Sequence, residues 1–419
     1  MPYRLNGNFA PISFQIPPFS AHSGLLVPDN LVTIPPPDVL ADVRQRILPN
    51  ATGRSVTLSA ESELKQHIEA VSLPEIGHSI AACGKVTAVR VEGRKAVVDI
   101  DLGFPAAGLH AAIVTAVSET VREHADVDEV TVNLATRITA HGVQRNLQPL
   151  DAVSNIIAIA SGKGGVGKST TAVNLALALA GEGASVGVLD ADIYGPSIPL
   201  MLGVAGERPT SEDGESMNPL SAHGVQVMSI GFLIDADQPM AWRGPMVTSA
   251  LNQMLKQTRW SGLDYLIVDM PPGTGDIQLT LSQSVPVSGA VIVTTPQDIA
   301  LLDARKGLQM FRKVSVPVLG IVENMSTHVC SACGHEEPIF GSGGGARMAE
   351  DYGVELLGQL PLDLGIREQT DSGTPTVIAD PDSAPAAAYR ATARKMATAL
   401  AIQGKDYSRR FPKIVVENE

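Results

Sequence analysis

The stretch SGKGGVGKSTT, residues 161–171, decides the fold because it has the pattern of a loop that holds a phosphate chain. It follows a short apolar run, residues 156–160, that is suited to a buried strand. The Ala- and Leu-rich stretch from Thr171 to Ala180 has the pattern of a helix that ends at Gly181. Glycines let backbone N–H groups approach phosphate oxygens closely, and a helix N-terminus favours an anion. The sequence therefore predicts a strand, a glycine-rich loop and a helix that together bind a nucleotide.

The G-x-x-x-x-G-K-[ST] pattern within this loop assigns roles to individual residues. Lys168 is predicted to reach the β- and γ-phosphates, and the Ser169 hydroxyl is predicted to ligate Mg²⁺. A second lysine, Lys163, lies inside the loop, where a cation beside a polyphosphate is expected to interact with it. The residues expected to contact ATP in the loop are Gly162, Lys163, Gly164, Gly165, Val166, Gly167, Lys168, Ser169 and Thr170.

Strand and helix patterns alternate from residue 156 onward. Apolar runs typical of strands occur at residues 186–189, 265–268, 290–293, 318–322 and 356–360. The stretches between them, for example residues 299–314, have helical patterns. Such alternation is typical of a parallel sheet covered on both faces. We therefore expect an α/β fold of the P-loop NTPase class, with a mostly parallel, doubly wound sheet.

Two acidic segments follow predicted strands of this sheet. Asp190 and Asp192 end one strand, and Asp269 ends another. Ligands of parallel sheets collect at the carboxyl ends of the strands. Asp269 is therefore predicted to be a partner of Mg²⁺, the usual role of an acid after an apolar strand in P-loop enzymes. For Asp192 and Asp269, the alternative interpretation is a helix N-cap or a turn position.

A smaller unit precedes the nucleotide-binding region. Residues 58–145 are predicted to form a compact α+β domain, with a helix from Ser62 to Val71 and two strands that turn at Glu92 to Arg94. A second helix carries Leu109, Ile113, Val117 and Val121 on one face, and a last strand follows at residues 127–134. The remaining segments are a proline-rich, mostly irregular extension (1–57), the ATPase domain (151–404) and a C-terminal tail (405–419).

The composition excludes several classes of protein. The net charge of −13 argues against a protein that binds nucleic acid or an anionic membrane, because both need a basic surface. No run of 18 apolar residues occurs, and the N-terminus lacks the apolar core of a signal peptide. Three cysteines do not indicate a disulfide framework. We expect a cytoplasmic protein.

Cys330 and Cys333 form a C-x-x-C pair for which three interpretations compete. A redox pair needs a helix start that Gly334 and His335 do not favour. A zinc site within one chain would use His328 or His335. Alternatively, two chains of a twofold dimer would supply the four thiolates of a [4Fe–4S] cluster or a Cys₄ zinc site. Thiolates alone do not distinguish iron–sulfur from zinc.

Two other features have simpler interpretations. Cys83 is placed at the start of a strand and is expected to be a small buried hydrophobic residue. The later glycine run, residues 341–345, lacks a following Lys-Ser/Thr and is interpreted as a flexible connector before a helix at residues 346–351.

Several spaced motifs within residues 155–345 resemble the Mrp family of deviant P-loop ATPases, which includes the ApbC-like iron–sulfur cluster carriers and is related to MinD and ParA. The motifs are KGGVGK (163–168), DADIYGPS (190–197), WRGPM (242–246), WSGLDYLIVDMPPGTGD (260–276) and GIVENMS (320–326). The small domain resembles the iron–sulfur assembly domain of many Mrp proteins. Where that domain often carries a Pro-Cys-Pro turn, this chain has Phe104, Pro105, Ala106 and Ala107.

This resemblance implies a homodimer whose nucleotide sites face each other, with Lys163 crossing to the partner's ATP. It makes Lys163, Lys168 and Asp192 catalytic, with Asp192 orienting the attacking water and joining Ser169 and Asp269 around Mg²⁺. It makes Asn324 the residue that reads adenine and places Cys330 and Cys333 at a labile [4Fe–4S] cluster between the subunits. The residues that the resemblance assigns to the switch II loop are Gly273, Thr274, Gly275 and Asp276.

The function expected on these grounds is ATP-dependent carriage of an iron–sulfur cluster from a donor to apo-protein recipients, with slow ATP hydrolysis. One alternative is a spatial-organising ATPase of the MinD or ParA kind. The C-terminal sequence, interrupted by Pro412, does not suit MinD's membrane helix, and the negative charge does not suit ParA's DNA surface. The other alternative is a zinc-bridged scaffold that binds ATP.

Overall fold

The computed structural model describes residues 51–144, 147–234, 244–330 and 332–403. The described residues from Thr57 onward form one compact unit. Most of the expected proline-rich extension, the tail from residue 405, and Trp242 and Arg243 of one motif lie outside the described residues. The first described helix, α2 (Ala51–Ala70), begins 11 residues before the predicted Ser62. The low helix propensity of its Ser, Thr and Gly residues hid these earlier turns from the sequence pattern.

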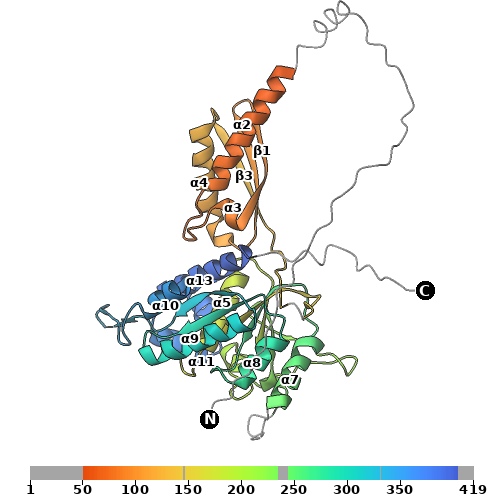
Figure 1. The fold of residues 1–419 in the computed structure, drawn as a ribbon, viewed down its shortest axis with the longest axis vertical. Helices are drawn as coiled ribbons and strands as arrows, with labels where there is room; N and C mark the ends of the chain where they lie inside the picture. The colour runs from red at the N-terminus through yellow and green to blue at the C-terminus, as the bar shows by residue number, and fades with distance from the viewer. Residues whose placement is uncertain (1–50, 145–146, 235–243, 331, 404–419) are drawn as a thin grey trace, which may run out of the picture. The chain divides into compact units, whose positions relative to one another are not determined.

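The small domain is a three-stranded sheet with helices, as expected (Figure 1). The sheet has the order β1-β2-β3, with β1 antiparallel to β2 and β2 parallel to β3. Helix α4 makes the crossover between β2 and β3 and buries Ile113, Val117 and Val121. The elements that follow α2 are α3 (Ile80–Cys83), β1 (Gly84–Glu92), β2 (Lys95–Leu102), η2 (Ala107–Leu109), α4 (His110–His124) and β3 (Glu129–Thr136).

The second sheet has eight strands in the order β13-β10-β9-β4-β8-β5-β7-β6. All its neighbouring pairs are parallel except β6 with β7. The expected α/β class is therefore confirmed, although β6 and β7 were not predicted. The strands are β4 (Val153–Ala160), β5 (Val186–Asp190), β6 (Leu220–Ala222), β7 (Val225–Ser229), β8 (Leu263–Asp269), β9 (Gly289–Thr294), β10 (Val318–Glu323) and β13 (Glu355–Gln359).

Helices alternate with these strands. Consecutive residues 156–160 of β4 are all buried, so both faces of this central strand are covered. The helices and 3₁₀ turns are α5 (Lys168–Gly181), α6 (Ile198–Met201), η3 (Ile230–Phe232), α7 (Gly244–Gln257), α8 (Asp276–Ser284), α9 (Asp298–Lys313), α10 (Gly344–Tyr352), α11 (Leu364–Asp371), α12 (Thr376–Ala379) and α13 (Ala384–Ala401).

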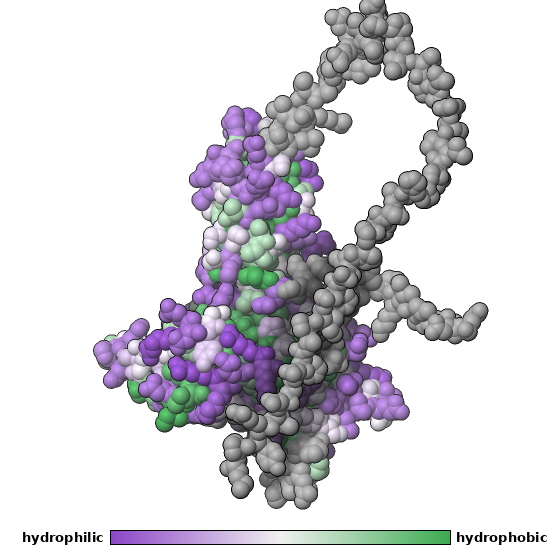
Figure 2. All heavy atoms as spheres, viewed as in Figure 1, coloured by the Kyte–Doolittle hydropathy of each residue, from purple (hydrophilic) through white to green (hydrophobic). Residues whose placement is uncertain are grey.

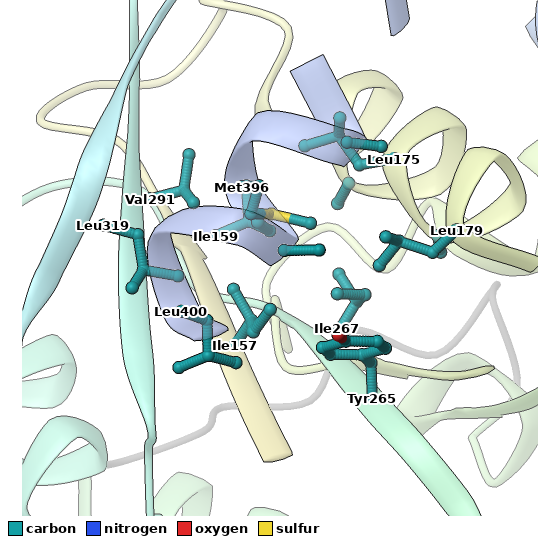
Figure 3. Packing of buried hydrophobic residues seen from close by; sticks show 14 of the residues in the cluster. Ile157, Ile159, Leu175, Leu179, Tyr265, Ile267, Val291, Leu319, Met396 and Leu400 are labelled. Carbon is teal, nitrogen blue, oxygen red and sulfur yellow. The ribbon is translucent and has the colours of Figure 1, made fainter. Parts of the chain in front are cut away.

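Two of these helices pack together on the central strands. Leu175 and Leu179 of α5 and Met396 and Leu400 of α13 lie against Ile157 and other side chains of β4, β8 and β9 (Figure 3). This packing fixes α5, whose first turn carries the predicted phosphate-binding lysine, directly over the centre of the sheet.

Polar residues predominate on the described part of the face drawn in Figure 2. Among the described residues, no helix has both the length and the apolar character needed to cross a membrane.

Candidate functional site

The phosphate loop connects the end of β4 to the start of α5, as its sequence predicted. Gly165 and Gly167 have φ angles of 83° and 79°, which side chains with a Cβ rarely adopt. Gly162 is required for a different reason, because a Cβ there would lie 2.1 Å from the carbonyl carbon of Asp303 in α9. The glycines thus shape the loop by both backbone conformation and close packing.

Lys168 and Ser169 meet an acid from a distant strand at the base of this loop. The Lys168 Nζ atom lies 2.6 Å from Oδ1 of Asp269, and the Ser169 hydroxyl donates to Oδ2 of Asp269 at 2.5 Å. Asp192 contributes a second carboxylate, with its Oδ2 atom 3.8 Å from Lys168 Nζ. The structure therefore brings together the four residues to which the sequence analysis assigned phosphate and Mg²⁺ contacts.

Three carboxyl groups, of which Asp190 and Asp269 are fully buried and Asp192 is partly exposed, lie near this single lysine. Burial, followed by the charge of Asp269, raises the pKa of Asp190 to about 8. Burial also raises the pKa of Asp192 and of Asp269, and the nearby Lys168 ammonium opposes both shifts. Such crowding of acids disfavours their ionised forms, and a divalent cation among them would restore those forms.

Asp190 organises the loop that carries Asp192. Its carboxylate accepts hydrogen bonds from the Ser229 hydroxyl at 3.0 Å and from the amides of Asp192 and Ile198, both at 3.2 Å. The sequence motifs assigned Asp190 no role of its own. Its partner Ser229 lies at the end of β7, a strand that the sequence did not reveal.

The donor set at this point suits Mg²⁺. Two carboxylates and a hydroxyl, from Asp192, Asp269 and Ser169, are hard oxygen ligands, and Mg²⁺ prefers such ligands together with phosphate oxygens and water. Within the described residues, no group of three or more His, Cys, Asp or Glu side chains could hold a metal. The protein thus supplies part of a coordination sphere that a bound nucleotide would complete.

A cavity of about 210 Å³ opens beside these groups. Its lining includes Gly164 and Gly165 of the loop, Thr170 of α5, and Pro272 after β8. The residues Gly273 to Asp276, predicted to be the switch II loop, join β8 to α8, and the Gly273 amide donates to the Ser161 carbonyl at 3.0 Å. This loop therefore touches the phosphate loop directly.

Lys163 and Asn324 lie differently from the groups around Lys168. The Lys163 side chain is partly exposed, and among the described residues its amine has no hydrogen-bond or ion-pair partner. Asn324, which follows β10, is buried, and its Nδ2 atom donates to the Val166 carbonyl at 2.9 Å. The candidate adenine-reading residue is thus bonded to the phosphate loop itself.

Cys330 and Cys333 lie in a hairpin formed by β11 (His328–Val329) and β12 (Glu336–Glu337). The Cys330 amide donates to the His335 carbonyl at 2.9 Å, and the Gly334 amide donates to the Cys330 carbonyl at 2.8 Å. Cys333 is exposed and Cys330 is partly exposed. Hydrogen bonds from the backbone of Ala332 and Cys333 lower the pKa of the Cys330 thiol. Both thiols are therefore accessible, and one is favoured as the thiolate that binds metals.

The histidines near this pair do not complete a site within one chain. The His328 Nδ1 atom lies 3.1 Å from the Leu362 carbonyl, and the exposed His335 forms no metal-binding group with the thiols in the described part of the hairpin. The structure thus offers two ligands per chain at this position.

Cys83 is buried, as expected of a small hydrophobic residue, and burial raises the pKa of its thiol to about 11. It ends α3, and β1 starts one residue later, at Gly84. The last glycines of the run 341–345 are also more structured than a connector. Gly344 and Gly345 start α10 in buried positions, and the Gly345 amide donates to the Glu323 carboxylate at 2.5 Å. No sequence pattern indicated this contact, because it joins residues 22 positions apart.

Comparison with known proteins gives two family matches. The family described as "NUBPL iron-transfer P-loop NTPase" matches residues 152–397, and the family described as "Iron-sulfur cluster assembly protein" matches residues 61–134. The chain is 63% identical over 261 residues to the iron-sulfur cluster carrier protein of Escherichia coli strain K12, which covers 62% of this chain and 71% of that protein.

Two further likenesses were found. The iron-sulfur cluster carrier protein of Haemophilus influenzae is 49% identical over 350 residues, covering 84% of this chain and 95% of that protein. The nucleotide-binding protein of Archaeoglobus fulgidus, solved in complex with ADP, is 38% identical with a TM-score of 0.47, covering 54% of this chain and 88% of that chain.

Proposed function

Since the chain belongs to the family of NUBPL iron-transfer P-loop NTPases, we propose that it carries a [4Fe–4S] cluster between proteins in a cycle driven by ATP. The cluster is cargo, held by Cys330 and Cys333 from each of two chains. The observation that carries this proposal is the accessible pair of thiols in a chain that also has a nucleotide site, with no third ligand among the described residues.

The nucleotide site supports Mg²⁺-dependent hydrolysis of ATP. Lys168 exchanges its bond to Asp269 for phosphate oxygens, which frees Asp269 to join Ser169 at the metal. Mg²⁺, when bound, would neutralise charge that develops on the phosphates. Asp192 lies on the same cavity and orients the attacking water. Turnover is slow in this proposal, because ATP acts chiefly as a switch of the dimer interface.

Counting ligands supports the dimer. A [4Fe–4S] cluster takes four thiolates, and one chain offers two that are accessible. A twofold axis through the cluster would supply the other two from the same hairpin of a second chain. The Lys163 amine, which has no partner among the described residues, fits the same arrangement, because a second chain would bring a triphosphate to it.

The test is anaerobic reconstitution of the full chain with iron and sulfide, for wild type, Cys330→Ala and the matched control Cys83→Ala. We expect wild type and the control to take up about two iron atoms per chain, or about four per dimer. We expect the Cys330 variant to lose the visible absorption and the EPR signal of the reduced cluster, and to leave apo-acceptor protein unloaded.

The metal content of the purified protein distinguishes an iron–sulfur cluster from zinc. Equal amounts of iron and sulfide on protein purified without oxygen would support the cluster. Stoichiometric zinc without sulfide would instead support the zinc-bridged scaffold. Equal iron uptake by wild type and Cys330→Ala would refute the hairpin as the binding site. Sedimentation of the loaded protein as a monomer would refute the shared cluster.

A further inference from the structure

Glu182 stands directly after the last residue of α5, and only 3% of its surface is exposed. Its carboxylate accepts bonds from Nε and Nη2 of Arg394, at 2.9 and 2.5 Å, and from the Gly108 amide at 2.8 Å. Its backbone carbonyl accepts from the Ala107 amide at 3.3 Å. One residue of the ATPase domain therefore holds two consecutive amides of the small domain.

Arg394 in α13 extends this contact to a second acid of the small domain. Its Nη1 atom donates to Oε2 of Glu75 at 2.8 Å, and the arginine is 8% exposed. Glu75 has a φ angle of 62°, a costly conformation for a residue other than glycine. This strained conformation therefore occurs at the residue whose carboxylate binds Arg394. We name the group of Glu182, Arg394, Glu75 and the amides of Ala107 and Gly108 the Glu182 joint.

The joint leaves no space at Gly108. A Cβ atom there would lie 2.3 Å from Arg394 Nη2 and 2.9 Å from Glu182 Oε1. Gly181 gives the opposite result one residue before Glu182, since a Cβ there would meet nothing within 4 Å. These two glycines offer a matched pair of substitutions, one that breaks the joint and one that does not.

Helix α5 connects this joint to the nucleotide site. Lys168 and Ser169 form its first turn, and Glu182 follows its last turn about 20 Å away along the helix axis. The helix is buried along nearly its whole length, so its ends move together rather than independently.

We propose that the Glu182 joint couples the nucleotide site to the small domain. Nucleotide binding at the N-terminal end of α5 strengthens the contact between the small domain and Glu182 at the C-terminal end of α5. The coupling rests on the proposed nucleotide function. The small domain thereby acts as a sensor of nucleotide state, with Glu182 and Arg394 as positioning residues that touch neither nucleotide nor cluster. By linkage, an intact small-domain contact strengthens nucleotide binding by the same factor.

The experiment measures amide hydrogen exchange of the full chain, resolved to single residues, with and without a non-hydrolysable ATP analogue. The reporters are the amides of Ala107 and Gly108, both bonded to Glu182. The internal control is the Leu109 amide, bonded at 2.9 Å to Ala106 within the small domain. We expect the analogue to slow exchange of the reporters about fivefold, in the range of ordinary allosteric coupling, and to leave the control unchanged.

Gly108→Ala should abolish this response and weaken analogue binding about fivefold, and Gly181→Ala should preserve both. Arg394→Gln should behave as Gly108→Ala does. Calorimetry on the same samples reports analogue binding directly. Bound analogue with unchanged reporter exchange in wild type would overturn the coupling and leave the proposed nucleotide function standing. Absence of analogue binding would overturn both.

Discussion

The ammonium of Lys168 and the carboxylate of Asp269 form a buried ion pair at 2.6 Å, although 101 positions separate them in the chain. The lysine assigned to the phosphates thus neutralises the acid assigned to the metal. In the proposed cycle each gives up the other when nucleotide and metal bind, so the pair holds the site together before its ligands arrive. This preorganisation requires both partners.

Lys168→Ala is expected to abolish ATP hydrolysis and to lower the free energy of unfolding of the nucleotide-free chain by about 3 kcal/mol. The reason is that Asp269 would stay buried without its counter-charge. Phosphate release and chemical denaturation measure the two effects. The double variant with Asp269→Asn should recover part of the lost stability, since the pair is coupled. Wild-type turnover in Lys168→Ala would contradict the site.

Two loop glycines are expected to respond differently to substitution. Gly162→Ala should lower the melting temperature, because its new methyl group would collide with the backbone of Asp303. Gly164→Ala should leave the melting temperature of the nucleotide-free chain unchanged, since a Cβ there meets nothing within 4 Å. Gly164 lines the cavity, so this variant should still bind ATP more weakly. Equal melting temperatures for the two variants would argue against the packing described.

Lys163→Ala is expected to abolish hydrolysis without changing the stability of the isolated chain, because its amine has no partner among the described residues. If Lys163 acts on the partner's nucleotide, mixing this variant with Lys168→Ala should restore activity. In the mixed dimer, one site has its own Lys168 and the partner's Lys163, so about a quarter of wild-type turnover is expected from random pairing. If the two variants stay inactive after their subunits exchange, Lys163 acts on the nucleotide bound to its own chain.

Cys83 is expected to make the stability depend on pH above 9. Burial raises the pKa of its thiol from 9.0 to about 11, so the unfolded chain loses this proton first. The contribution is therefore constant below pH 9, and stability is lost as pH rises from 9 toward 11. Denaturation midpoints at pH 8 and 10 should differ more in wild type than in Cys83→Ala. The exposed Cys333, changed to Ala, should leave the wild-type difference intact.

The sequence predicted the structural features that depend on residues close together in the chain. The phosphate loop, the helix after it and the strands at 186–189 and 265–268 were found because their glycines and apolar runs are local. Strand β6 has three residues, Leu220–Ala222, which is too short for a period to appear. Strand β7, which supplies Ser229 to Asp190, has five residues and was also missed.

Contacts between distant segments that belong to no recognised motif were beyond the sequence pattern. Arg394 and Glu182 are 212 positions apart, and nothing near either residue indicates the other. The motif GIVENMS drew attention to Asn324 but not to Glu323, whose carboxylate holds Gly345. Pairing of this kind depends on how the helices cross the sheet, which only a three-dimensional structure provides.

The bond between Glu323 and Gly345 has an architectural consequence. It ties together the two ends of the segment, residues 324–344, that carries Cys330 and Cys333. The chain on either side of this segment is therefore held independently of the hairpin within it. The proposed cluster-binding hairpin is therefore modular. A hairpin with different metal-binding side chains could replace residues 328–337 while Asn324 keeps its bond to the phosphate loop.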